Sequence, residues 1–374
     1  MTSKYLGADG LDFSVIADKQ SGGLSIGVIG CGYWGSKHVR VLNAITNVRQ
    51  VVIVEPDPES RAAILSAFPA ARGFPDLASA LPHVDAIVIA TPPTTHFDLA
   101  LSALKNNKHV LVEKPLATSV VQAQVLVRAA REAGKVLMAG HTFLFVPAVR
   151  ELKCRLDKGE LGPVHYIHSA RLNLGLYRPD VNVIWDLAPH DITIMNYLLQ
   201  SRPDTVSAWG ASFACGTVED VAYIRLDYKR LGVSGYCHLS WLDPRKERTI
   251  TVVGTRKMAV YDDLADERLR IYDCGVRGLD QESPPHERPL SCRYGDIISP
   301  FLSPDEPLAS EDQHFVDCIR KGTTPESSGV DGMVVIAILE ALDRSLEERA
   351  LVEVDYPLDP DQTECNGEEQ LMVG

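Results

Sequence analysis

The chain has 374 residues, of which 45% are hydrophobic and 23% are charged, and its formal net charge is −13. The length predicts two or three domains with substantial cores, and the acidic balance argues against nucleic acid or an anionic membrane as the main partner. No apolar stretch reaches the roughly 20 residues of a membrane span, and residues 1–23 lack the apolar core of a signal peptide, so we expect a cytoplasmic protein.

Strands and helices alternate between residues 24 and 141, after an N-terminal extension of residues 1–23. The expected strands are 24–29, 50–54, 86–90, 110–112 and 136–139, and the expected helices are 34–43, 59–68, 96–106 and 120–134. Such alternation with short connections predicts an α/β domain with a doubly wound parallel sheet.

The pattern changes after residue 141, and several strand-like runs follow one another without intervening helices. The expected strands are 164–174, 205–210, 221–228, 233–241, 248–254, 257–262 and 351–354, and the expected helices are 146–158, 186–199, 311–321 and 333–348. Consecutive strands predict a mainly antiparallel sheet in a second α/β domain, residues 142–356. We expect a long loop over 280–307 and an acidic tail over 357–374.

A glycine-rich turn joins the first strand to the first helix, in the run Gly-Cys-Gly-Tyr-Trp-Gly. Gly30 permits the tight turn, Gly32 lets a backbone approach a pyrophosphate, and Gly35 lets the helix pack on the strand. The amides near Tyr33 and Trp34 would point at phosphate from a helix N-terminus. The turn therefore predicts a dinucleotide-binding Rossmann domain over 24–141.

An acidic residue, Glu55, ends the second strand at the offset expected for a ribose-binding carboxylate. It would accept hydrogen bonds from the adenosine ribose and repel a 2′-phosphate, which favours NAD over NADP. Arg61 is the nearest arginine downstream, and nothing in the sequence places it in the site.

A lysine, Lys114, follows an apolar strand in the run Glu-Lys-Pro. An ammonium at the end of a buried strand costs desolvation energy, so a functional reason is expected. Ligands bind at the carboxyl ends of the strands in an open α/β sheet. Together with Asp186 and His190, this lysine indicates an oxidoreductase.

These features resemble the Gfo/Idh/MocA family over roughly residues 24–354. The resemblance rests on the glycine turn, Ala-Thr-Pro-Pro followed by His96, the Glu-Lys-Pro motif, and Asp186 with His190. It implies a Rossmann domain followed by an α/β domain with a large open antiparallel sheet that binds substrate. It also implies that the nicotinamide lies between the domains and that homodimers or homotetramers form through the open sheet.

The resemblance also implies roles for individual residues. Thr91, Pro92 and His96 would line the cofactor, and Glu113 and Lys114 match a motif whose lysine contacts the substrate hydroxyl and the nicotinamide ribose. The Lys114–Pro115 peptide bond is often cis in this family. His141 stands where many relatives have asparagine, which is a departure within the cofactor-binding set.

Asp186 and His190 lie four residues apart, so on a helix they share one face. Oxidation of a secondary alcohol requires removal of a hydroxyl proton, a role that suits His190, while Lys114 would stabilise the developing negative charge. Repulsion between Lys114 and a protonated His190 would lower both pKa values. Alternatively, Asp186 is a helix N-cap and His190 a satisfied buried histidine. Trp185 is either a core residue or a wall beside the nicotinamide.

Substrate-binding candidates precede this helix, where Arg171, Asn173 and Tyr177 belong to a stretch that suits hydroxyl or phosphate groups. Surface solvation is the alternative for the arginine. Trp241, at a later strand end, would line the pocket or an oligomer contact. Metal is not expected, because the eight cysteines show no Cys-x-x-Cys spacing and His314 with Cys318 lacks a further ligand.

The sequence thus predicts an NAD-dependent dehydrogenase that oxidises a secondary hydroxyl of a sugar, nucleotide sugar or aminocyclitol. Two alternatives stay open. One is a glycosidase that uses NAD for transient oxidation and elimination, and the other is a non-catalytic dinucleotide sensor. The set Lys114, Asp186 and His190 argues against the sensor, which would need none of the three.

Overall fold

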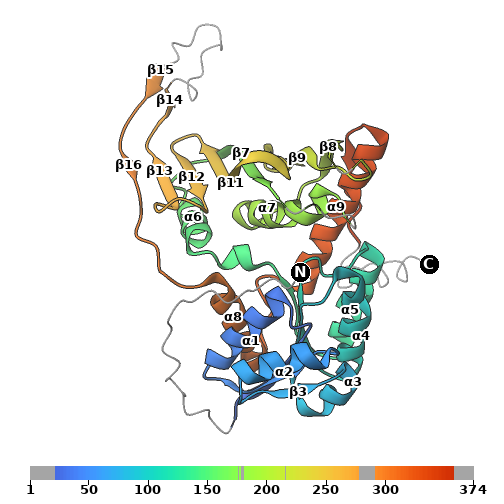
Figure 1. Cartoon of the computed structure of the whole chain (residues 1–374). Helices are drawn as coiled ribbons and strands as arrows, with labels where there is room; N and C mark the ends of the chain where they lie inside the picture. Colours follow the sequence, from blue (N-terminus) through green and yellow to red (C-terminus); the bar gives the residue numbers. More distant parts are fainter. Residues whose placement is uncertain (1–21, 176, 178–180, 215, 278–290, 358–374) are drawn as a thin grey trace, which may run out of the picture.

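The computed structural model describes residues 22–175, 177, 181–214, 216–277 and 291–357 (Figure 1). Nearly all of the predicted extension 1–23 and the predicted tail 357–374 lie outside these residues. The described chain forms two α/β units, one below the other in Figure 1. No helix among the described residues is long and apolar enough to cross a membrane.

The N-terminal unit contains a parallel six-stranded sheet in the order β3-β2-β1-β4-β5-β6, as the alternating pattern predicts. Its strands are β1 (Leu24–Ile29), β2 (Val48–Val54), β3 (Arg72–Phe74), β4 (Ala86–Ile89), β5 (His109–Glu113) and β6 (Leu137–Gly140). Its helices are α1 (Tyr33–Ala44), α2 (Pro58–Ala67), α3 (Leu77–Ala80), α4 (His96–Lys105) and α5 (Val120–Glu132), with 3-10 turns η1 (Leu81–His83) and η2 (Pro93–Thr95). Apart from the short edge strand β3, the strands are largely buried on both faces and therefore read as apolar runs.

The second unit contains a nine-stranded sheet in the order β16-β13-β12-β11-β7-β10-β9-β8-β17. Its strands are β7 (Val164–Leu174), β8 (Thr205–Ala211), β9 (Val221–Tyr228), β10 (Val233–Ser240), β11 (Leu242–Gly254), β12 (Met258–Asp262), β13 (Leu269–Tyr272), β16 (Ile297–Ile298) and β17 (Val352–Glu353). All neighbours are antiparallel except β7 and β10, so the prediction of a mainly antiparallel sheet is confirmed. A separate ribbon of β14 (Gly275–Arg277) and β15 (Ser291–Arg293) projects from one edge (Figure 1).

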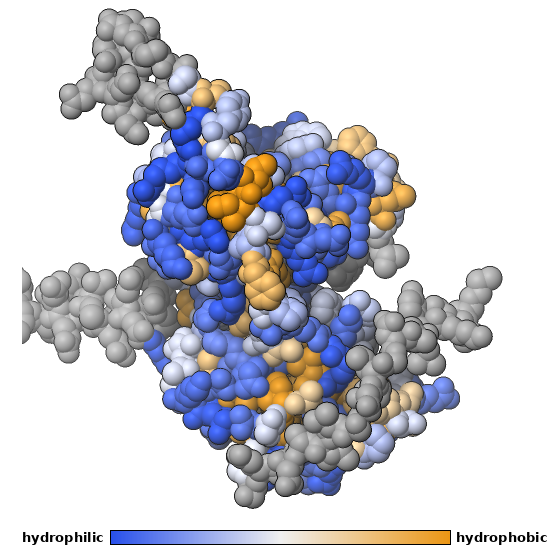
Figure 2. All heavy atoms as spheres, turned by 90° about the vertical axis from the view of Figure 1, so that its left-hand side faces the viewer, coloured by the Kyte–Doolittle hydropathy of each residue, from blue (hydrophilic) through white to orange (hydrophobic). Residues whose placement is uncertain are grey.

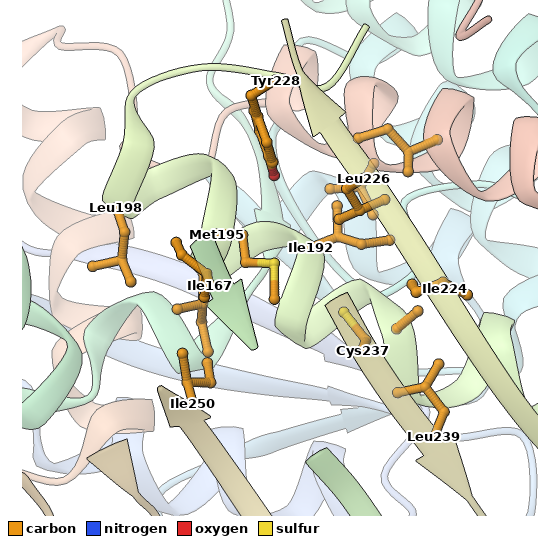
Figure 3. Packing of buried hydrophobic residues seen from close by; sticks show 14 of the residues in the cluster. Ile167, Ile192, Met195, Leu198, Ile224, Leu226, Tyr228, Cys237, Leu239 and Ile250 are labelled. Atoms are coloured by element: carbon orange, nitrogen blue, oxygen red, sulfur yellow. The ribbon is translucent and has the colours of Figure 1, made fainter. Parts of the chain in front are cut away.

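Helix α7 (Val183–Leu199) covers one face of this sheet. Figure 3 shows Ile192, Met195 and Leu198 of α7 pointing at apolar side chains of the strands, and these belong to one buried cluster. The other helices of this unit are α6 (Pro147–Asp157), α8 (Pro307–Lys321) and α9 (Gly329–Glu348), and the 3-10 turn η3 (Thr142–Phe145) connects the units.

The chain returns to the first unit after completing most of the second. Leu308, Phe315 and Val316 of α8 lie in a buried cluster with residues of β1, β2 and α1, and Met333 and Ile336 of α9 pack beside β5. The predicted second domain, 142–356, therefore includes helices that complete the core of the first. The two units are consequently joined by packing as well as by chain connections.

The opposite face of the nine-stranded sheet carries exposed aromatic side chains. Trp209 is 55% exposed and Tyr223 is 50% exposed, and their rings lie 5.9 Å apart. Apolar surface also appears on the side shown in Figure 2, where the chain runs from β16 to α8 in Figure 1. Among the described residues of that segment, Ile297, Ile298 and Phe301 are exposed.

Several element boundaries differ from the predictions. Helix α7 begins at Val183 rather than at Asp186, because Asn182 caps it by accepting a hydrogen bond from the Trp185 amide. The predicted loop 280–307 contains the short strands β15 and β16, and α8 begins at Pro307. Strand β3 escaped prediction because its three residues, Arg-Gly-Phe, carry no apolar run.

Candidate active site

Four adjacent strands of the parallel sheet end at the same edge and deliver four of the predicted residues there. Gly30 follows β1, Thr91 lies just beyond β4, Lys114 follows β5 and His141 follows β6. Since β1, β4, β5 and β6 are neighbours in the sheet, these residues form a row at its carboxyl edge. This edge is where ligands bind in open α/β sheets.

The glycine turn has the geometry of a phosphate cradle. Gly30 adopts a positive φ of 81°, and a Cβ on Gly35 would lie 2.0 Å from the Gly30 carbonyl oxygen. A Cβ on Gly32, in contrast, would meet no atom within 4 Å among the described residues. Helix α1 begins at Tyr33 without a side-chain cap, so its first amides are left for an anion. The turn therefore fits a dinucleotide.

Two alanine substitutions separate folding from binding at this turn. We expect Gly35→Ala to destabilise the protein by about 3 kcal/mol or more, because the methyl group meets backbone. Gly32→Ala should cost less, about 1–2 kcal/mol, since the space around the new methyl group is open while the backbone there (φ −68°, ψ −149°) lies outside the regions that alanine favours. The same methyl group should weaken dinucleotide binding by at least about tenfold. Thermal unfolding and calorimetric titration would measure both effects, and unchanged affinity in Gly32→Ala would contradict this role.

Glu55 links the end of β2 to the glycine turn. Its carboxylate accepts hydrogen bonds from the Cys31 amide at 3.1 Å and from the Asp57 amide at 3.2 Å. Burial, followed by the nearby Glu55 charge, raises the pKa of the Cys31 thiol to about 12, which fits a packing role. Arg61 lies closer than expected, because its guanidinium donates to the Glu55 and Pro56 carbonyl oxygens.

His96 connects the loops after β4 and β5. One ring nitrogen lies 2.7 Å from the Pro115 carbonyl oxygen and the other 2.8 Å from the Thr91 carbonyl oxygen, and the residue is buried. Burial lowers the pKa of His96. This placement favours a role in holding the Thr91 and Lys114 loops rather than a direct contact with a cofactor. The neighbouring Pro92 is exposed, and the Lys114–Pro115 peptide bond is cis.

Lys114 contacts Asp186, one of the predicted site residues of α7. Its ammonium donates to the Asp186 carbonyl oxygen at 3.0 Å and lies 3.6 Å from the Asp186 carboxylate. The other carboxylate oxygen accepts from the indole of Trp241 at 3.2 Å. Asp186 lies in the first turn of α7 behind the Asn182 cap, so the N-cap alternative is wrong. The ammonium thus sits at the junction of the two units with its charge partly balanced.

His190 lies one turn further along α7 and is half-buried. Its Nδ1 is shielded from solvent and has no hydrogen-bond partner among the described residues, so His190 is not a fully satisfied core histidine. Burial lowers the pKa of His190 well below its ordinary range, and Lys114 is the second cause. The expected repulsion by Lys114 therefore contributes, but desolvation contributes more. The imidazole is neutral at pH 7 and able to accept a proton.

His141 lies beside both groups and is buried. Burial lowers its pKa to about 4, so it is neutral at physiological pH. Its Nδ1 lies 3.4 Å from the Thr193 hydroxyl of α7, while the buried Nε2 meets no hydrogen-bonding partner in the described chain. A buried nitrogen that lacks a hydrogen-bond partner in the described chain fits a site in which a bound group supplies that partner.

Glu113 is held by a buried histidine that the sequence analysis did not single out. His38 of α1 lies 3.0 Å from the Glu113 carboxylate and 2.8 Å from Asp312 of α8. Burial alone would lower the pKa of His38, but Asp312 and Glu113 together raise it well above its ordinary value. The second Glu113 oxygen accepts from the Lys114 amide at 3.3 Å. A positively charged His38 therefore fixes the residue that precedes Lys114.

Replacing His38 by glutamine should destabilise the protein in a pH-dependent way. Loss of the cation leaves Glu113 and Asp312 without their partner, at a cost of about 3–5 kcal/mol. Because the folded-state pKa of His38 is raised, its contribution is complete below pH of about 6.5 and declines as pH rises through the raised value. Urea unfolding of both proteins from pH 5.5 to 9 would measure the difference. A difference that grows with pH would contradict this assignment.

The substrate-binding candidates divide into two groups. Tyr177 lies beside the site, with its ring 6.2 Å from that of Trp241, and Asn173 is half-buried near the end of β7. Arg171 instead lies in the interior and pairs with Asp191 at 2.8 Å, which favours a positioning role over substrate binding. Trp185 packs against the cores of both units and donates its indole N–H to Asp343.

Two family models match the chain. The model described as "Oxidoreductase family, NAD-binding Rossmann fold" matches residues 24–141, and the "GFO/IDH/MocA C-terminal domain" matches residues 149–260. The chain is 26% identical to scyllo-inositol 2-dehydrogenase (NAD(+)) of Bacillus subtilis (strain 168), over 73% of this chain and 79% of that protein. It is 33% identical to UDP-N-acetylglucosamine 3-dehydrogenase of Acidithiobacillus ferrooxidans, over 50% of this chain and 58% of that protein.

A solved structure is similar over most of the length. GenD2 from gentamicin A biosynthesis, in complex with NAD, is 27% identical and superposes with a TM-score of 0.73, covering 89% of this chain and 97% of that one. The order of the motifs, the two-unit fold and these matches agree with one another. The chain therefore belongs to the Gfo/Idh/MocA family and is an oxidoreductase with an NAD-binding Rossmann domain.

Proposed function

We propose that the protein is an NAD-dependent dehydrogenase that oxidises a secondary hydroxyl of a sugar, nucleotide sugar or aminocyclitol to a ketone. The observation that carries the proposal is the meeting of Lys114, Asp186 and His190 beside the glycine turn. A site that only sensed a dinucleotide would need neither a partly buried ammonium nor a neutral imidazole beside it. When bound, the nicotinamide supplies the acceptor for the hydride that leaves the hydroxyl-bearing carbon.

The protein side chains bind the substrate hydroxyl, stabilise its developing charge and accept its proton. Lys114 donates a hydrogen bond to the substrate hydroxyl oxygen and stabilises the negative charge that develops there. His190 accepts the hydroxyl proton, and burial keeps it neutral and ready to do so. Asp186 orients the ammonium, while the Trp241 indole holds the other oxygen of its carboxylate.

The acid at the end of β2 supports NAD as the cofactor, with NADP less favoured. Glu55 places a carboxylate where an adenosine ribose would lie, and it would repel a 2′-phosphate. Arg61 lies nearby, but its guanidinium is engaged by the Glu55 and Pro56 carbonyl oxygens. Titration of the protein with each dinucleotide would test this preference, and tighter binding of NADP would overturn it.

The substrate class rests on the site and on what the relatives act on. The names of the similar proteins include an inositol dehydrogenase and a UDP-N-acetylglucosamine dehydrogenase. Near Asp186, Trp241 and Tyr177 provide aromatic surface next to a carboxylate, a combination that suits the apolar faces and hydroxyl groups of a carbohydrate.

A substrate screen would test the proposed reaction. We would ask whether NAD co-purifies with the protein and measure absorbance from NADH with panels of sugars, nucleotide sugars and aminocyclitols. NADH formation with one panel supports the dehydrogenase. Cleavage of a glycoside without net NADH would indicate the glycosidase, and dinucleotide binding with neither reaction would indicate a sensor.

We also propose that the protein forms a homodimer or homotetramer through the open face of the nine-stranded sheet. Exposed aromatic rings of Trp209 and Tyr223 on such a face resemble an interface more than a solvated surface. Trp209→Arg should therefore lower the molar mass measured by light scattering. Val121→Arg, a change at an exposed apolar residue of α5, should leave the mass unchanged. A monomeric wild-type protein would contradict this proposal.

A further inference from the structure

A buried ion pair lies beneath His190 and has no part in the mechanism described above. Arg171 of β7 is 6% exposed and Asp191 of α7 is 1% exposed. The guanidinium donates to the carboxylate from Nη2 at 2.8 Å and from Nε at 3.3 Å. Such a pair contributes little net stability compared with well-packed apolar residues, so stability alone does not account for it.

One aromatic ring connects this pair to His190. The Arg171 guanidinium carbon lies 4.6 Å from the centre of the Phe143 ring, a cation–π distance. The same ring lies 4.7 Å from the imidazole of His190 at an interplanar angle of 54°. Phe143 belongs to η3, the turn that connects the two units. The ring of Phe143 therefore contacts both the guanidinium of β7 and the imidazole of α7.

Among the described residues, no carboxylate bonds to the Nδ1 of His190, which leaves packing to orient the ring. In many catalytic histidines, a carboxylate accepts a hydrogen bond from the ring nitrogen that faces away from the substrate. Here Asp186 is engaged by Lys114 and Trp241, and within the described ranges no group bonds to His190 Nδ1. The charged and titratable groups that act on the imidazole are Lys114, Arg171, His141 and Arg248.

We propose that the Arg171–Asp191 pair is a positioning unit for His190, which it fixes through the ring of Phe143. Asp191 holds the guanidinium and neutralises it, the guanidinium holds the ring, and the ring fixes the plane of the imidazole. The proposal rests on the function proposed above, in which His190 accepts the substrate proton.

Three variants and one control test the proposal. Phe143→Leu removes the ring, Arg171→Lys keeps the charge but loses the planar fork, and the double variant Arg171→Met with Asp191→Leu replaces the pair by apolar groups. Arg155→Met is the matched control, because Arg155 of α6 is likewise a poorly exposed arginine that pairs with carboxylates, those of Glu151 and Glu160. Unfolding curves establish which proteins are folded, and kcat is then compared per folded molecule.

We expect Phe143→Leu and the double variant to stay folded and to lose at least tenfold in kcat, with KM for NAD changed by less than twofold. Arg171→Lys should recover part of the loss, and Arg155→Met should match the wild type. Loss of stability with unchanged kcat per folded molecule would show that the pair is only structural and would overturn the proposal.

A second measurement does not need turnover. Nuclear magnetic resonance of histidine-labelled protein should show a changed titration midpoint and changed ring chemical shifts for His190 in the double variant, because the guanidinium that contacts the Phe143 ring is gone. An unchanged midpoint together with unchanged ring chemical shifts would also overturn the proposal. If the wild-type protein oxidises no substrate, the function fails, while this titration still decides whether the pair acts on His190.

Discussion

Lys114→Ala should lower kcat/KM for the sugar-type substrate by about 10²–10³, the usual loss when a single stabilising donor for a developing oxyanion is removed. In the proposed mechanism the ammonium, which lies 3.6 Å from the Asp186 carboxylate, donates a hydrogen bond to the substrate oxygen at the carboxyl edge of the sheet. Because the charge on the oxygen develops only as the proton leaves, most of the loss should fall on kcat.

Steady-state kinetics of Lys114→Ala beside Lys105→Ala would measure this effect. Lys105 is an exposed residue at the end of α4 and serves as the control for removal of a positive charge. Lys114→Arg should restore only part of the activity, since a guanidinium does not reproduce the geometry of the ammonium. Near-normal turnover of Lys114→Ala would refute the role assigned to the lysine.

His190→Asn should lower kcat by about 10²–10⁴, the range expected when a general base is lost. The wild-type rate should also fall on the acid side, as the imidazole becomes protonated. Because burial and Lys114 lower the pKa of His190, this fall should occur below pH 6.5, the ordinary value for histidine. Near pH 7 the rate should therefore be independent of small changes in pH.

The pH profile of kcat/KM distinguishes a base from a residue that only packs. His190→Asn should lose the acid limb attributed to the imidazole, whereas His83→Asn, a change at an exposed histidine, should keep it. Retention of the same limb in His190→Asn would assign the titration to another group. An acid limb centred above pH 7 in the wild type would contradict the direction of the shift.

Much of the fold was predictable because its signals are local. Alternating apolar runs and short connections indicate the parallel sheet, and the glycine turn indicates the nucleotide edge. Helix α7 was placed three residues late because Asn182, rather than Asp186, is its cap, and both residue types suit that position. Strand β16 was missed because it has only two residues, which pair with β13 across a long separation in sequence.

The site was predictable where function depends on short motifs. Lys114, Asp186 and His190 stand in such motifs, and the structure brings them together. The residues that fix Glu113, next to Lys114, were harder to predict from the sequence. His38 and Asp312 lie 274 residues apart, and neither belongs to a recognisable local pattern. The pairing of Arg171 with Asp191 was not predicted for the same reason, since sequence spacing does not reveal which carboxylate an arginine will contact.

The return of α8 to the first unit has a consequence for biosynthesis. The apolar surface beside α1 and β1 is covered by Phe315 and Val316, which leave the ribosome only after almost all of the second unit. Although N-terminal domains generally fold first during synthesis, this one cannot complete its core until α8 and α9 have been synthesised. A nascent chain that stalls after residue 141 would therefore expose the apolar surface of the nucleotide-binding unit that α8 covers, and chaperones bind such surfaces.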